Sequence, residues 1–156
     1  MKIAVLDNLR SVHNVGSLFR TANAAGVQKI ILCGTTPTPL DNRGDPRKDF
    51  AKVALGAENT ITWEYQEDIN SALQELKESG CYIIAIEQDQ KSVDYKTVSV
   101  DITQNVAFVI GPEVQGMSQE TLALCDVIAE IPMLGTKESL NVTIAFGVAV
   151  YGILKI

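Results

Sequence analysis

The feature that most constrains this fold is an alternation between short apolar runs and amphipathic segments along the whole chain. The short runs, such as KIAVL at 2–6 and NVAFVIG at 105–111, are almost continuously apolar, which is typical of strands buried on both faces of a parallel sheet. Between them, apolar residues recur at helical spacing, as Ile69, Leu73 and Leu76 do. The alternation predicts an α/β fold with a mostly parallel sheet flanked by helices.

The boundaries of these elements can be read from caps, prolines and glycines. Strands are expected at 2–6, 29–34, 59–65, 81–87, 105–111 and 127–133. Helices are expected at 14–26, 47–57, 67–80, 118–125 and 139–154, and the proline-rich stretch 35–46 is expected to be a loop. Ligands of open α/β sheets collect at the carboxyl ends of strands. The informative loops should therefore follow Leu6, Cys33, Ile86, Ile110 and Ile131.

Length and composition predict one soluble domain over residues 1–156. The 156 residues are 46% hydrophobic and 21% charged, which are ordinary values for a globular domain. No stretch reaches the roughly 18 uncharged apolar residues that a membrane span needs, so a cytoplasmic protein without membrane contact is the simplest interpretation. The three cysteines are widely spaced, so we expect free thiols, no disulfide framework and no metal site.

The charge is unevenly distributed. The net charge of −6 argues against a general nucleic-acid binder. Residues 1–56, however, hold eight basic and four acidic residues, whereas the remainder holds five basic and fifteen acidic ones. This asymmetry either marks an anionic partner for the N-terminal part or is an uneven surface without function.

The first segment with chemical potential is HNVGSLFRTANAAG at 13–26. Asn14, Gly16 and Arg20 are spaced N-x-G-x-x-x-R across an expected helix start, where free backbone N–H groups favour an anion. Gly16 would let a ligand approach the backbone, and Arg20 lies one turn further on the same face. A capped helix with an exposed arginine explains the spacing equally simply. His13, the only histidine, is expected in the loop before the helix.

The second segment, FVIGPEVQGMS at 108–118, follows a strand. It has Gly111, Glu113 and Gly116 but matches neither the dinucleotide fingerprint nor a P-loop. Glu113 would accept a hydrogen bond from a ligand or from a helix start; an ordinary strand-to-helix loop is the alternative.

The third segment, IPMLGTKESLNV at 131–142, runs from a strand through Gly135 into the last helix. Ser139 is the expected helix cap. Asn141 then stands in an apolar helix, where a buried amide needs a partner. It would either face a polar site or tie down the preceding loop.

Taken together and in this order, the three segments resemble the three motifs of the SpoU (TrmH-like) family of SPOUT RNA 2′-O-ribose methyltransferases. LGAENT at 55–60 also looks like the family's stretch between the first two motifs, and the resemblance extends from residue 3 to 154. The matching residues are Asn14, Gly16, Arg20, Gly111, Glu113, Gly116, Ile131, Pro132, Met133, Ser139, Leu140 and Asn141.

The resemblance implies a C-terminal deep trefoil knot, S-adenosylmethionine held in that knot, and a homodimer as the active unit. It implies methyl transfer to a ribose 2′-hydroxyl of RNA, with tRNA favoured and rRNA next. Arg20 is then the residue that activates the hydroxyl, with Asn14, Glu113, Ser139 and Asn141 orienting it and the substrate. Because a guanidinium almost never loses its proton, stabilisation of the alkoxide is preferred over direct base action. The donor would be held by Ile86, Gly111, Gly116, Ile131, Met133, Ser139 and Leu140.

No separate RNA-binding domain is expected, so either this domain itself or an accessory protein would bind the RNA. The basic residues expected to contact it are Arg10, Arg43, Arg47 and Lys48. Two other classes stay open. One is a non-catalytic RNA-binding or dimerisation module with the same fold, which the acidic net charge favours. The other is an ordinary nucleotide-binding α/β protein.

Overall fold

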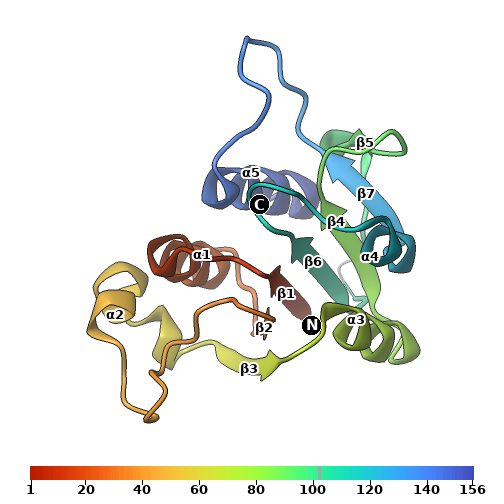
Figure 1. The fold of residues 1–156 in the computed structure, drawn as a ribbon. Coiled ribbons are helices and arrows are strands. Elements are labelled where there is room, and N and C mark those ends of the chain that lie inside the picture. Colours follow the sequence, from red (N-terminus) through yellow and green to blue (C-terminus); the bar gives the residue numbers. More distant parts are fainter. Residues whose placement is uncertain (102) are drawn as a thin grey trace.

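A single parallel sheet organises the computed structural model, which describes residues 1–101 and 103–156. Its strand order is β3-β2-β1-β6-β4-β7-β5, and every adjacent pair is parallel (Figure 1). The strands are β1 (Lys2–Asp7), β2 (Lys29–Cys33), β3 (Thr62–Gln66), β4 (Tyr82–Ile86), β5 (Val93–Asp94), β6 (Val106–Ile110) and β7 (Val127–Glu130). The helices are α1 (Val12–Ala24), α2 (Lys48–Ala54), α3 (Ile69–Glu78), α4 (Gln119–Leu124) and α5 (Val142–Leu154), with single 3-10 turns η1 (Ala57–Asn59) and η2 (Tyr95–Thr97).

Helices cover both faces of the sheet, as the sequence pattern predicts. Along β1, Ala4 and Leu6 belong to the core beneath α1 and α5, whereas Ile3 and Val5 belong to the core beneath α3 and α4. Both sets are at most 5% exposed, which explains why β1 shows no polar alternation. Among the described residues, no helix combines the length and hydropathy that crossing a bilayer requires.

The first helix begins earlier than expected. Ser11 caps α1, because its hydroxyl accepts a hydrogen bond from Asn14 N at 3.2 Å. The predicted start at Asn14 is therefore wrong, and His13 lies in the first turn of the helix rather than in a loop. This shift leaves the Asn14 side chain free to act elsewhere.

The last helix begins later than expected. Asn141, not Ser139, is the cap of α5, and its side-chain oxygen accepts from Thr143 N at 2.9 Å. Asn141 is exposed, so the sequence puzzle of a buried amide does not arise. The preceding strand also ends early, at Glu130, which leaves Pro132 and Met133 in a loop.

Two further differences concern short elements. The two-residue strand β5 pairs with β7 and was not expected, because two residues carry no periodicity. The helix expected at 47–57 ends at Ala54, where Leu55 and Gly56 both take positive φ. The loop at 35–46 and the Ser118 cap of α4 are confirmed. So are buried free thiols at Cys33 and Cys81.

Candidate active site

A cavity of about 570 Å³ opens at the carboxyl ends of β6, β4 and β7, next to the start of α1. This volume is typical of small-molecule sites, and its place fits the rule for open α/β sheets. Three loops and the first turns of two helices line it: Arg10, Ser11, Asn14, Ile86, Glu87, Gln88, Ile110, Gly111, Pro112, Glu113, Ala129, Glu130, Ile131, Met133, Ser139, Leu140, Asn141, Val142 and Ala145.

The first and second segments meet at one edge of the cavity. Asn14 Nδ2 donates a hydrogen bond to Glu113 Oε1 at 2.6 Å, across 99 positions of sequence. Because Ser11 begins the helix, Asn14 lies in the first turn of α1, beside the loop that follows β6. The bond fixes the carboxylate in one orientation and joins the two segments.

Glycines shape the loop after β6. Gly111 is buried, and a Cβ there would meet the side chain of Met117. Gly116 has a φ of +68°, which favours glycine, and a Cβ there would lie 2.9 Å from Glu87 Oε2. Gly111 lines the cavity, whereas Gly116 is outside the lining and turns the chain toward the amide of Met117.

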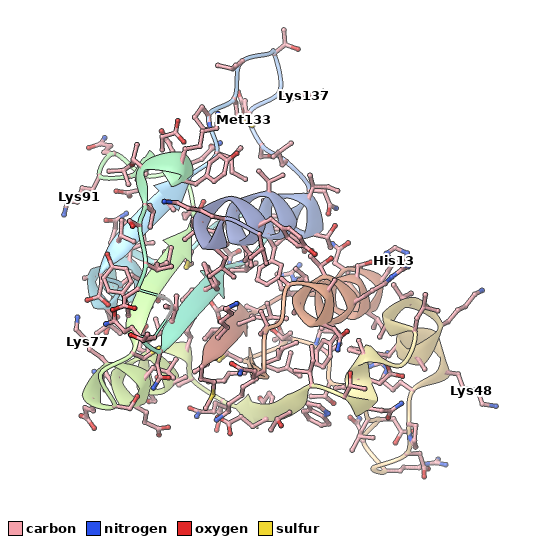
Figure 2. All side chains as sticks on the ribbon, turned by 180° about the vertical axis from the view of Figure 1, so that it is seen from behind. His13, Lys48, Lys77, Lys91, Met133 and Lys137 are labelled. Atoms are coloured by element: carbon pink, nitrogen blue, oxygen red, sulfur yellow. The ribbon has the colours of Figure 1, made fainter. Side chains whose placement is uncertain are left out.

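The third segment forms the opposite wall. Ile131, Met133, Ser139, Leu140 and Asn141 all line the cavity, and Figure 2 shows Met133 where the loop leaves the body of the molecule. As the cap of α5, Asn141 uses its side-chain oxygen to accept a hydrogen bond from the first turn of that helix.

A family model described as the SpoU rRNA Methylase family matches residues 1–151. The chain belongs to this family. It is 34% identical over 145 residues to the 23S rRNA (guanosine-2′-O-)-methyltransferase RlmB of Neisseria meningitidis, covering 93% of this chain and 54% of that protein. It is 32% identical over 153 residues to a putative TrmH family tRNA/rRNA methyltransferase of Staphylococcus haemolyticus, covering 98% and 58%. The chain thus spans somewhat more than half the length of these curated relatives.

Solved structures agree with this SpoU assignment. The AdoMet-bound rRNA methyltransferase of Sinorhizobium meliloti superposes with a TM-score of 0.86 at 27% identity, over 99% of this chain and 56% of that one. The TrmH/SpoU tRNA modifying enzyme of A. aeolicus gives a TM-score of 0.83 at 27% identity, over 99% and 74%.

Two residues of the first SpoU motif lie elsewhere than the sequence suggested. Gly16 is buried against α2, where a Cβ would lie 3.1 Å from Val53 Cβ and 3.2 Å from Phe50 O. The expectation that it admits a ligand is therefore wrong, since it permits close helix packing instead. Arg20 follows Asn14 by six residues, about 9 Å along the helix axis, and is absent from the cavity lining.

Arg20 instead borders a separate groove between α1 and α5. This groove, of about 370 Å³, is lined by Ser17, Arg20, Thr21, Ala24, Thr143, Ile144 and Tyr151. In a single chain, the fold therefore brings four of the five predicted catalytic residues to the cavity, namely Asn14, Glu113, Ser139 and Asn141. The fifth, Arg20, lies outside it.

The predicted RNA-contacting residues fall into two places. Arg10 lines the cavity, whereas Arg43, Arg47 and Lys48 surround a depression on the loop between β2 and α2. Lys48 and Met133 lie at opposite ends of the molecule in Figure 2. Arg47 is paired with Asp49, at 2.9 Å from Nη2 and 3.2 Å from Nε. This hydrogen-bonded pair raises the pKa of Arg47 and lowers that of Asp49.

The cavity also contains charged residues that sequence reasoning did not select. Glu87 and Glu130 line it together with Glu113, and Arg10 is the one basic residue among the lining residues. The loop after Ile86 was expected to matter, and its first polar residues, Glu87 and Gln88, were the available signal. Among the described residues, no group of three His, Cys, Asp or Glu side chains forms a metal site.

Proposed function

We propose that this protein transfers the methyl group of S-adenosylmethionine to a ribose 2′-hydroxyl of RNA. The observation that carries the proposal is the cavity itself, where all three SpoU motifs contribute lining residues at the ends of three parallel strands. Names of relatives at 27–34% identity, including an AdoMet-bound rRNA methyltransferase, support the same donor and reaction class.

The cavity suits this donor in shape and charge. Ile86, Gly111, Ile131, Met133 and Leu140 supply apolar walls and backbone groups for an adenosine. S-adenosylmethionine carries one net positive charge, whereas its demethylated product is neutral. Three carboxylates against one arginine would therefore favour the donor over the product. When bound, the donor supplies an electrophilic methyl group.

Activation of the ribose hydroxyl requires a group that stabilises negative charge, and Arg20 is our candidate. The Asn14–Glu113 pair would orient the ribose beside the cavity, since Glu113 has lone pairs to spare for a hydroxyl. Arg20 would then stabilise the developing alkoxide without losing its proton. Its distance from Asn14 along α1 suggests that the site is incomplete in one chain.

A homodimer would complete it. Ile144, Val148 and Tyr151 follow one face of α5 and are 54%, 37% and 37% exposed, which is unusual for a helix of such apolar sequence. Ile144 and Tyr151 line the Arg20 groove, and the same helix starts at the cavity with Asn141. Packing this face against a second copy would bring the Arg20 of one copy to the interface bordering the partner cavity.

Mixing two inactive variants tests whether Arg20 acts across the dimer. Arg20→Ala and Glu113→Ala should each lose methyl transfer as homodimers. In a heterodimer, one of the two sites would regain both residues, so a random mixture should recover about a quarter of wild-type activity. No recovery, despite heterodimers detected by native mass spectrometry, would place Arg20 in the same chain as the cavity it serves.

The first acceptor to test is an rRNA guanosine, because curated relatives at 34% and 32% identity are named for 23S rRNA. The initial preference for tRNA has weaker support, from the A. aeolicus protein, which is named a tRNA modifying enzyme. Transfer of label from S-adenosylmethionine to 23S rRNA fragments and, separately, to bulk tRNA would distinguish the two acceptors. Label in neither, combined with no donor binding, would leave the non-catalytic module as the better account.

We also propose that the C-terminal part is knotted, as the resemblance implies. In support, α5 packs against η2, and a Cβ at Gly152 would meet the ring of Tyr95. The last helix therefore packs closely against an earlier segment, as a knotted chain requires. Tracing the chain for a trefoil after extending both ends outward tests this directly.

A further inference from the structure

Glu87 secures one of the two loops that flank the cavity. Its Oε2 accepts a hydrogen bond from Met117 N at 3.1 Å, just after the turn at Gly116. Its Oε1 accepts from Gln88 N at 2.9 Å, which orients the next residue. The residue that follows β4 therefore ties the second motif to the floor of the cavity.

Gln88 secures the opposite loop. Gln88 Nε2 donates to the backbone oxygen of Glu138 at 2.9 Å. Within residues 1–101 and 103–156, this is the one hydrogen bond that joins residues 132–140 to another part of the chain. Figure 2 shows Lys137 on this loop, which projects from the body of the molecule. Ser139 and Leu140, which line the cavity, directly follow the tethered residue.

We propose that Gln88 is a positioning residue for donor binding, which holds the 132–140 loop in place before the donor arrives. A loop already ordered in its binding conformation costs less to order when the ligand binds. The side chain acts through the Glu138 carbonyl and through Ser139 and Leu140, not by reacting itself. The inference rests on the proposed function for the identity of the ligand, but the tether exists independently of it.

The size of the effect follows from one neutral hydrogen bond. Such a bond changes an equilibrium by about 2- to 10-fold. Losing it should raise the equilibrium constant for loop opening by that factor. Donor affinity scales with the closed fraction of the loop, so it should fall by the ratio of the closed fractions, which is at most the same factor.

Gln88→Met tests the tether, because methionine has the same length and no donor. Gln90→Met is the matched control, since Gln90 is exposed two residues on and its side chain forms no hydrogen bond with the described part of the chain. Brief trypsin treatment without donor, with mass spectrometry of the fragment that starts at residue 138, measures loop opening. Cleavage after Lys137 should rise by up to about 10-fold in Gln88→Met, with a melting temperature lowered by no more than about 5 °C, and stay at the wild-type rate in the control.

Calorimetry with S-adenosylhomocysteine measures the consequence for the cavity. Gln88→Met should weaken binding of this probe measurably, by at most the factor of about 2 to 10 by which loop opening rises, and kinetics should show a raised donor KM with an unchanged kcat. Unchanged cleavage overturns the proposal, and so does faster cleavage with an unchanged Kd. If the wild type fails to bind the probe, the proposed function is wrong, while the cleavage ratio still decides whether Gln88 holds the loop.

Discussion

The hydrogen bond between Asn14 and Glu113 joins the first and second motifs, and an isosteric change tests it. Asn14→Asp keeps the shape but replaces the donor by a carboxylate 2.6 Å from Glu113 Oε1. Two unit charges at this distance repel by about 1.6 kcal/mol at the dielectric constant of water and about 6 kcal/mol at a value of 20. Glu113 is exposed, so the lower figure applies. With about 1 kcal/mol for the lost hydrogen bond, the free energy of unfolding should fall by up to about 2.6 kcal/mol at pH 7, less any relief from loop movement.

This loss should depend on pH in a definite direction. Repulsion raises the pKa of the carboxyl pair in the folded variant above the ordinary values near 4. A group with a raised folded pKa contributes stability at low pH, which is lost as pH rises through that folded pKa. A protonated carboxyl at position 14 can also donate again. Urea unfolding of variant and wild type should therefore show the full deficit at pH 7 and less than about 1 kcal/mol of it at pH 4.

A second substitution supplies the control. In the Asn14→Asp background, Glu113→Gln reverses donor and acceptor and should restore most of the lost stability at pH 7. Glu120→Gln removes an exposed carboxylate on α4 and should restore none. Equal unfolding energies for Asn14→Asp and wild type at pH 7, or equal recovery by both second substitutions, would refute the geometry.

Three other regions give separate tests. Gly111→Ala should lower stability by about 1–3 kcal/mol in thermal unfolding and weaken donor binding, because its Cβ would meet the Met117 side chain; Gly135→Ala, with open space around it, should match wild type. Burial raises the pKa of Asp7 to about 6, so the wild type should lose stability as pH rises from 4 to 7, whereas Asp7→Asn should not. In urea unfolding, the free energy of unfolding of Asp7→Asn relative to wild type should therefore increase by up to about 3 kcal/mol over this range, and a difference that stays constant with pH would contradict the prediction. Lys48→Glu should weaken RNA binding in filter assays while donor affinity stays unchanged. Equal RNA affinity of variant and wild type would exclude the depression around Arg43, Arg47 and Lys48 as an RNA contact.

The sheet was predictable because most of its long strands are apolar runs between turn residues, and β3 alternates polar and aromatic residues instead. β5 was not, since two residues carry no pattern and its pairing with β7 is set by the tertiary fold. The start of α5 was ambiguous for a similar reason. Ser139 and Asn141 are both good caps, and only the hydrogen bond to Thr143 decides between them.

The site was predictable only through the resemblance. Asn14 and Glu113 lie 99 residues apart, so no local spacing connects them. Conversely, helix geometry alone could have separated Arg20 from Asn14, because six residues turn a helix by about 240° beyond one full turn. Gly16 shows that a glycine in a sequence is ambiguous. Close packing against α2 and close approach of a ligand both require the absence of a side chain, so the sequence does not distinguish between them.

Locating the transferred methyl group tests the central claim most directly. RNA treated with the protein and labelled S-adenosylmethionine is hydrolysed in alkali, which cleaves only next to a free 2′-hydroxyl. Ribose methylation predicts label in alkali-resistant dinucleotides, and its loss in Arg20→Ala. Label recovered in mononucleotides would show methylation of a base and would contradict the account.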